Sequence, residues 1–96
     1  MVSIIARVHV KEGKMEEAIK VLKEIVPKIK ENEAGCLEYI PHVVKGRKNK
    51  NKIVFYEKYE DEEALKAHSA NLPKSLAKLM PLLEPGMEIE QCTEIV

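Results

Sequence analysis

The chain of 96 residues is 45% hydrophobic and 33% charged, and its 16 basic side chains balance its 16 acidic ones. This composition is typical of a folded globular protein rather than a disordered one, and the length suits a single domain over residues 1–96 that gains stability by oligomerising. Because the net charge is zero, no overall field attracts the chain to nucleic acid or to anionic lipid, so any partner has to be recognised locally.

A strand and a long helix are predicted first. Residues 2–10 alternate between two faces with a period of two, which indicates a strand with one buried face. After a turn at Gly13, apolar residues recur at steps of three and four over residues 14–32 and predict a helix that packs on a sheet. Pro27 lies within this helix, where it lacks an amide hydrogen and crowds the carbonyl of Lys23, so we expect a kink or an early end there.

The next predicted element is an edge strand. Gly35 can end the first helix and open a strand over residues 36–43. Strict alternation places Tyr39 on one face of this strand and Cys36 on the other. Pro41 lacks the amide hydrogen that a central strand needs, so it favours a position at the edge of the sheet.

A basic loop separates that strand from the next one. Residues 45–52, KGRKNKNK, contain no apolar side chain and several turn formers, so we expect a solvated hairpin loop. The loop has no interleaved aromatics and no signature of a nucleic-acid-binding fold; capture of an anionic substrate is the alternative if it reaches a pocket mouth. The strand that follows covers residues 52–59 and points Glu57 and Tyr59 to the same side.

The second half of the chain is predicted to hold two helical segments and a last strand. Asp61 is a suitable N-cap for a short helix that carries His68 on its apolar side. Apolar residues continue the helical spacing beyond it, and Pro73 suits the first turn of the next helix. Asn71 could cap that helix or bond a substrate, and we favour the cap. Residues 87–95 then alternate as a final strand.

The order of these elements is βαββαβ, which predicts an α+β, ferredoxin-like fold. Right-handed crossovers give an antiparallel sheet with the strand order 4-1-3-2 and both helices on one face. Strands one to three also carry apolar or aromatic residues on the opposite face, which has to be covered. A second copy of the chain would cover it, so we expect a homodimer of the dimeric α+β barrel type.

The remaining features indicate a cytoplasmic protein that has no membrane-spanning helix and no disulfide bond. No apolar run approaches the roughly 18 residues that a membrane-spanning helix needs, and MVSIIARVHV has no charged n-region and no cleavage site. Cys36 and Cys92 lack CxxC spacing and fall on opposite edges of the predicted sheet, which is too far for a disulfide. We interpret both as structural thiols.

Four stretches of the sequence resemble a known family: IIARVHVKEGK, IVPKIKENEAGCLEYIPH, IVFYEKYEDEEALKAH and PLLEPGMEI. Together they span almost the full chain and closely resemble the antibiotic biosynthesis monooxygenase (ABM) domain family, particularly its quinol monooxygenase branch. The more specific parts are Gly35-Cys36 followed by Tyr39, and the strand-to-helix segment that contains Glu57 and His68. The resemblance implies a dimeric α+β barrel with a small apolar pocket in each subunit, which oxidises phenols or quinols without flavin, haem or metal.

Two departures from the family narrow what the resemblance implies. Tyr59 stands where the family usually has a tryptophan, and the chain has no tryptophan at all. A mechanism in which an indole contacts the substrate is therefore not expected. Haem-degrading relatives use an asparagine on the first strand, and residues 2–10 contain none. Haem degradation is not expected either.

Three candidate site residues are predicted to face one cavity. Glu57 and Tyr59 point to the same side of their strand, and the following helix folds back over that side and brings His68 toward them. Cofactor-free oxygenation needs a base for a phenolic proton, a donor for the oxyanion and dry walls. Our hypothesis makes His68 the base or oxyanion partner and Glu57 the group that orients it. Tyr39 and Tyr59 shape the ring site, and Asn71 is a further candidate substrate contact.

Each of these residues also has a structural interpretation. His68 could be a hydrogen-bonded core histidine, and Glu57 could simply pair with a lysine or a backbone amide if it is buried. Tyr39 and Tyr59 suit a core with their hydroxyls bonded to polar neighbours. The three histidines share no ligand spacing such as HxxxH, so no metal site is predicted.

The leading functional hypothesis is a cofactor-independent monooxygenase that acts on a small phenol or quinol with dioxygen. The first alternative is an isomerase-type enzyme that transfers protons on a small phosphorylated sugar or ketone, because a histidine and glutamate pair suits that chemistry as well. The second alternative is a noncatalytic dimer that binds a small ligand.

Overall fold

The structure is a computed structural model that describes residues 1–96. Its elements follow in the order β1 (Val2–His9), α1 (Met15–Asn32), β2 (Cys36–Val43), a 3₁₀ turn (Arg47–Asn49), β3 (Lys52–Tyr59), α2 (Glu62–Ser75), a 3₁₀ turn (Met80–Leu82) and β4 (Glu88–Thr93). This order confirms the predicted βαββαβ, ferredoxin-like fold. None of its helices is both long and apolar enough to cross a membrane.

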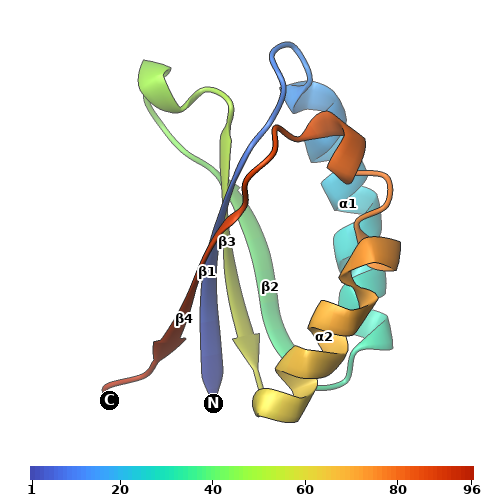
Figure 1. Cartoon of the computed structure of the whole chain (residues 1–96), viewed down its shortest axis with the longest axis vertical. Coiled ribbons are helices and arrows are strands. Elements are labelled where there is room, and N and C mark those ends of the chain that lie inside the picture. The colour runs from blue at the N-terminus through green and yellow to red at the C-terminus, as the bar shows by residue number, and fades with distance from the viewer.

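The four strands form one antiparallel sheet with the order β2-β3-β1-β4, which is the predicted order read from the other edge. Both helices lie on the same side of this sheet, and the opposite side carries no helix (Figure 1). Pro41 lies on β2 at an edge of the sheet, as predicted.

The core lies between the sheet and the two helices. One face of β1 and β3 is buried together with the inner face of α1, and Tyr59 and Ala18 are completely inaccessible to solvent. Leucines from the end of α2 and from the 3₁₀ turn that follows close the other end of the core. The buried apolar residues of the two layers include Val2, Ile4, Ala6, Val8, Ile53 and Phe55 from the strands and Ala18, Leu22, Ile25 and Ile29 from α1.

The prediction that Cys36 and Tyr39 face opposite sides of β2 is wrong. The pairing of β2 with β3 shifts by one residue between Cys36 and Glu38, which is the signature of a β-bulge. The extra residue restores Tyr39 to the face that Cys36 occupies, and both side chains are buried beneath the helices. Burial raises the pKa of the Cys36 thiol to about 11, and both cysteines are free. Cys36 is thus a structural thiol, as predicted.

Neither Pro27 nor Pro73 ends or begins a helix, which corrects the early end considered at Pro27 and the first-turn position expected of Pro73. α1 continues through Pro27 to Asn32, because Ile25 and Ile29 on either side of the proline are buried and their packing offsets a penalty of about 3 kcal/mol. The segment after His68 is not a new helix, since α2 runs unbroken to Ser75 with Pro73 inside it. Asn71 consequently lies within α2 and caps nothing.

The start of α2 is held against the turn between α1 and β2. Asp61 is the predicted N-cap, and its carboxylate accepts a hydrogen bond from the Ala64 amide at 2.8 Å. Gly35 lies directly opposite Ala64, and a Cβ added to Gly35 would stand 2.5 Å from the Ala64 Cβ. This close approach, which only glycine permits, sets how deeply α2 sits over the sheet.

Candidate functional site

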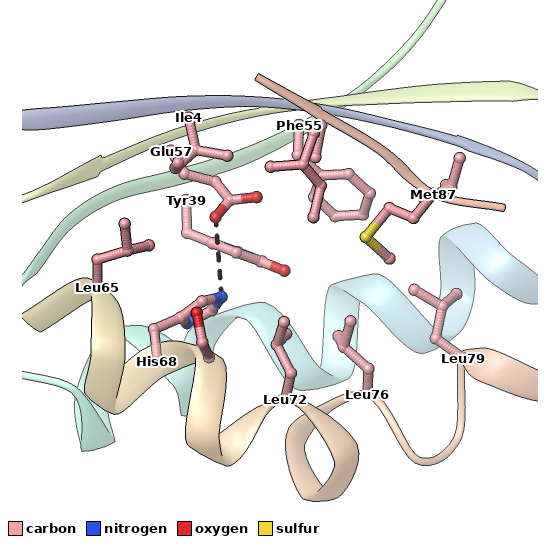
Figure 2. Close-up of a pocket in the computed structure, with 14 residues that line it drawn as sticks. Ile4, Tyr39, Phe55, Glu57, Leu65, His68, Leu72, Leu76, Leu79 and Met87 are labelled. Carbon is pink, nitrogen blue, oxygen red and sulfur yellow. Dashed lines mark ion pairs between the residues drawn. The ribbon is translucent and has the colours of Figure 1, made fainter. Parts of the chain in front are cut away.

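A small apolar pocket lies between the sheet and α2 (Figure 2). Its volume is about 60 Å³, enough for a few water molecules or dioxygen. Only three of its 14 lining residues are polar, namely Glu57, His68 and Ser69. The predicted cavity under the helix therefore exists, and both of the predicted chemical groups face it.

His68 projects from α2 into the pocket, toward the sheet (Figure 2), and is 3% exposed. Its Nδ1 atom lies 2.7 Å from Oε1 of Glu33, and its Nε2 atom lies 3.7 Å from Oε1 of Glu57. Figure 2 shows the second of these pairs bridging the gap between α2 and the sheet. The imidazole is thus held between two carboxylates, one at each ring nitrogen.

Glu57 enters the pocket from the middle of β3 and is 6% exposed. The Tyr59 hydroxyl donates a hydrogen bond of 2.6 Å to Oε1 of Glu57. Burial raises the pKa of Glu57 above its ordinary value, and the negative charge of Glu33 adds to this effect; the bond from Tyr59 and the proximity of His68 act in the opposite direction. Glu57 can therefore exchange a proton more readily near neutral pH than an exposed glutamate can.

Tyr39 forms a side wall of the pocket. Its ring centroid lies 5.2 Å from that of His68 and 5.6 Å from that of Phe55, and the ring lies in the layer between the sheet and α2 (Figure 2). Burial, reinforced by the Glu57 charge, raises the pKa of the Tyr39 hydroxyl. The hydroxyl therefore stays protonated at neutral pH and can donate a hydrogen bond.

The structure places the other two predicted residues outside the cavity. Tyr59 is fully buried behind Glu57, which it supports, and its ring centroid lies 5.1 Å from that of His68. Asn71 is exposed and faces a separate polar hollow between α1 and α2. Three residues along a helix bring Asn71 to within about 60° of His68 around the helix axis, yet the two side chains line different hollows, one beneath α2 and one between the helices.

Glu33 was missed by the sequence analysis. It is the C-cap of α1, and its side chain is 10% exposed. The prediction gave the orienting role to Glu57, whereas the carboxylate in hydrogen-bond range of the imidazole belongs to Glu33. One feature of the sequence could have indicated Glu33: it is an acidic residue at the C-terminus of a helix. The helix dipole disfavours a negative charge at that end, so a favourable contact with another group is expected.

These groups allow acid–base chemistry in a dry environment. A histidine beside a carboxylate can take up a proton, and a protonated tyrosine can hold an oxyanion. The chain contains no cluster of three or more histidine, cysteine, aspartate or glutamate side chains arranged to hold a metal ion.

The fold and the pocket define a small α+β protein with an imidazole, a carboxyl group and a tyrosine around an apolar hollow. The family profile described as antibiotic biosynthesis monooxygenase, ABM, matches residues 1–73, and the chain belongs to this family. None of the curated proteins matches the sequence.

Solved structures resemble the chain over nearly its whole length. A candidate antibiotic biosynthesis monooxygenase from Caulobacter crescentus has a TM-score of 0.83 at 25% identity and covers 99% of this chain and 90% of its own. A Bacteroides thetaiotaomicron protein described as a possible oxidoreductase has a TM-score of 0.76 at 25% identity, covering 95% and 94%. A protein of Shewanella oneidensis has a TM-score of 0.75 at 29% identity, covering 95% and 87%.

Proposed function

We propose that this protein is a cofactor-independent monooxygenase of the quinol monooxygenase type, which oxidises a small phenol or quinol with dioxygen. The observation that carries the proposal is the placement of His68 and Glu57, 3.7 Å apart, in a pocket whose other walls are almost entirely apolar. Membership of the ABM family and the resemblance to a candidate monooxygenase support it.

The reaction balances without an external reductant. A phenol or quinol with a hydrogen on the ring carbon opposite or next to a hydroxyl becomes a quinone. One atom of dioxygen enters as the new carbonyl oxygen, and the other leaves as water with the hydroxyl hydrogen and the ring hydrogen. His68 takes the phenolic proton, and the resulting phenolate gives an electron to dioxygen. The two radicals combine at the ring carbon, the imidazolium returns its proton to the peroxide, and loss of the C–H proton breaks the O–O bond.

The other residues of the pocket have supporting roles in this scheme. Tyr39 donates a hydrogen bond to the phenolate oxygen and flanks the ring. Glu57, held by Tyr59, accepts the C–H proton, which its raised pKa favours. The apolar walls exclude water, which would otherwise compete for the peroxide.

The substrate has to be small, and the pocket has to widen for it. A volume of about 60 Å³ is below the range of roughly 300 Å³ and more that is usual for organic ligands. Leu65, Leu72 and Met87 are only partly buried where they line the pocket, so their side chains can move at low cost. We propose that a single aromatic ring enters by displacing these three side chains.

We also propose that the working form is a homodimer. Ile40, Tyr56 and Ile5 are paired neighbours on three adjacent strands and form an apolar row across the face of the sheet that no helix covers. A second copy packed face to face would cover this row and add rigidity to the sheet from which Glu57 projects.

A second candidate function rests on the same pair of residues. A buried carboxyl and an imidazole also suit proton transfer next to a carbonyl, as in the isomerisation of a small phosphorylated sugar or ketone. Such an enzyme would exchange substrate hydrogen with solvent deuterium and would consume no dioxygen. A dimer that only binds a ligand would do neither.

Oxygen uptake with a panel of quinols and phenols tests the proposal. We expect uptake above the uncatalysed rate for at least one compound, and His68→Gln should lower kcat by about 10²- to 10⁴-fold while the fold is retained. Lys66→Ala, at an exposed position on the same helix and outside the pocket lining, is the matched control and should leave kcat within a few fold. Uptake that never exceeds the uncatalysed rate, or full activity of the His68 variant, would refute the proposal.

A further inference from the structure

The second carboxylate at His68 comes from a different part of the chain and occupies a different environment. Glu33 and His68 are 35 residues apart, and their side chains meet at 2.7 Å, at the junction of α1 and α2. On its other side Glu33 lines a polar hollow of about 490 Å³ between the two helices, together with Lys28, Lys74 and Asn71. Glu33 therefore lies between His68, which lines the apolar pocket, and the polar hollow.

The two carboxylates are not equivalent partners of the imidazole. The Glu33 contact is within hydrogen-bond range, whereas the Glu57 contact of 3.7 Å is not. The Glu57 oxygen nearest to the ring already accepts the hydrogen bond from Tyr59. Nδ1 is thus the ring nitrogen with a committed acceptor, and Nε2 is the nitrogen left for the pocket.

We infer that Glu33 is a positioning residue, which fixes His68 in the tautomer that carries its hydrogen on Nδ1. The basic lone pair of Nε2 then faces the pocket, and the negative charge stabilises the imidazolium that forms when Nε2 takes up a proton. This inference rests on the proposed function only in that His68 is the base.

The surroundings of His68 bear on the same assignment. No lysine or arginine makes an ion pair with Glu33 or Glu57, so the imidazole is the one basic group paired with either of them. The titratable groups in contact with the ring are Glu33 from the end of α1, Tyr39 from β2, and Glu57 and Tyr59 from β3.

Nitrogen-15 NMR of histidine-labelled protein tests the inference directly, because the two ring nitrogens have different shifts in the two neutral tautomers. We expect neutral His68 in the wild type to carry its hydrogen on Nδ1, with a slowly exchanging proton signal from that site. Glu33→Ala should shift the population toward the other tautomer and abolish that signal. Glu31→Ala, an exposed acid near the same helix end, should change neither.

Two results would overturn the inference: a wild-type His68 that carries its hydrogen on Nε2, or an unchanged tautomer in Glu33→Ala. The wild-type spectrum decides by itself if the variant does not fold.

Kinetics separate this inference from the proposed function. If uptake of dioxygen is found, Glu33→Ala should lower kcat by about 10²-fold or more with little change in KM. If no uptake is found but the tautomer is as stated, the proposed function fails and the role of Glu33 stands.

Discussion

Tyr59 donates a hydrogen bond of 2.6 Å to Oε1 of Glu57, two residues earlier on the same strand, and both side chains are buried. A carboxyl group in an apolar interior is costly unless its oxygens are bonded, and Tyr59 supplies that bond without reducing the exposure of Glu57 to the pocket. The hydrogen bond from Tyr59 therefore stabilises the buried carboxyl group of Glu57.

Removing that donor should destabilise the protein. Tyr59→Phe keeps the ring and leaves the Glu57 oxygen without its partner, so we expect the free energy of unfolding to fall by about 1–3 kcal/mol. Urea denaturation followed by circular dichroism measures the loss. Tyr56→Phe, on the same strand but on the open face of the sheet, is the control and should cost less. If the free energy of unfolding fell equally in the two variants, the hydrogen bond from Tyr59 to Glu57 would not contribute measurably to stability.

The raised pKa of Glu57 predicts a pH dependence of stability. A carboxyl group whose pKa is higher in the folded state binds its proton more tightly there than in the unfolded chain. Its contribution to stability is complete below the unfolded pKa and is lost as the pH rises through the folded one. Relative to Glu57→Gln, which has no such proton, the wild type should therefore become less stable as the pH is raised from about 4 into the neutral range.

Denaturation of both proteins in urea across that range measures the difference. Because all other titratable groups are shared, their contributions largely cancel, and those that remain come from the coupled neighbours Glu33 and His68. A difference that is constant with pH, or that grows in favour of the wild type as pH rises, would contradict the burial of Glu57 described here.

The sequence predicted the elements that have a strong period and missed the contacts that join distant segments. The predicted bounds of the strand over residues 52–59 match β3 because the alternation of buried and less buried residues is uninterrupted there. The bulge in β2 could not be predicted from the sequence, because one extra residue changes the face on which Tyr39 lies without changing the composition of the strand. Glu33 was missed because its partner lies 35 residues away, and the close approach of Gly35 to Ala64 that brings them together has no local signature.

The open face of the sheet predicts the state of assembly. If a second copy covers the apolar row that contains Ile40, light scattering should give twice the chain mass of 10.9 kDa. Ile40→Asp should then produce a folded monomer, because two charges would be buried at the centre of the interface. Val43→Asp is the matched control: it lies on the same strand, is also exposed, and faces the helix side. A wild-type monomer at micromolar concentration would refute the dimer.

The contact between Gly35 and Ala64 predicts a specific pattern in a double-mutant cycle. A Cβ on Gly35 would stand 2.5 Å from the Ala64 Cβ, which is too short to be relieved without moving α2. Gly35→Ala should therefore lower the free energy of unfolding by about 1–3 kcal/mol, as other overpacked sites do. Ala64→Gly alone should cost up to about 1 kcal/mol through lost helix propensity.

The double variant should be more stable than Gly35→Ala, because the glycine at 64 supplies the missing space. Since the same contact sets the depth of α2, the His68 signals should move in Gly35→Ala and return in the double variant. Losses that simply add would show that the two residues are not in contact.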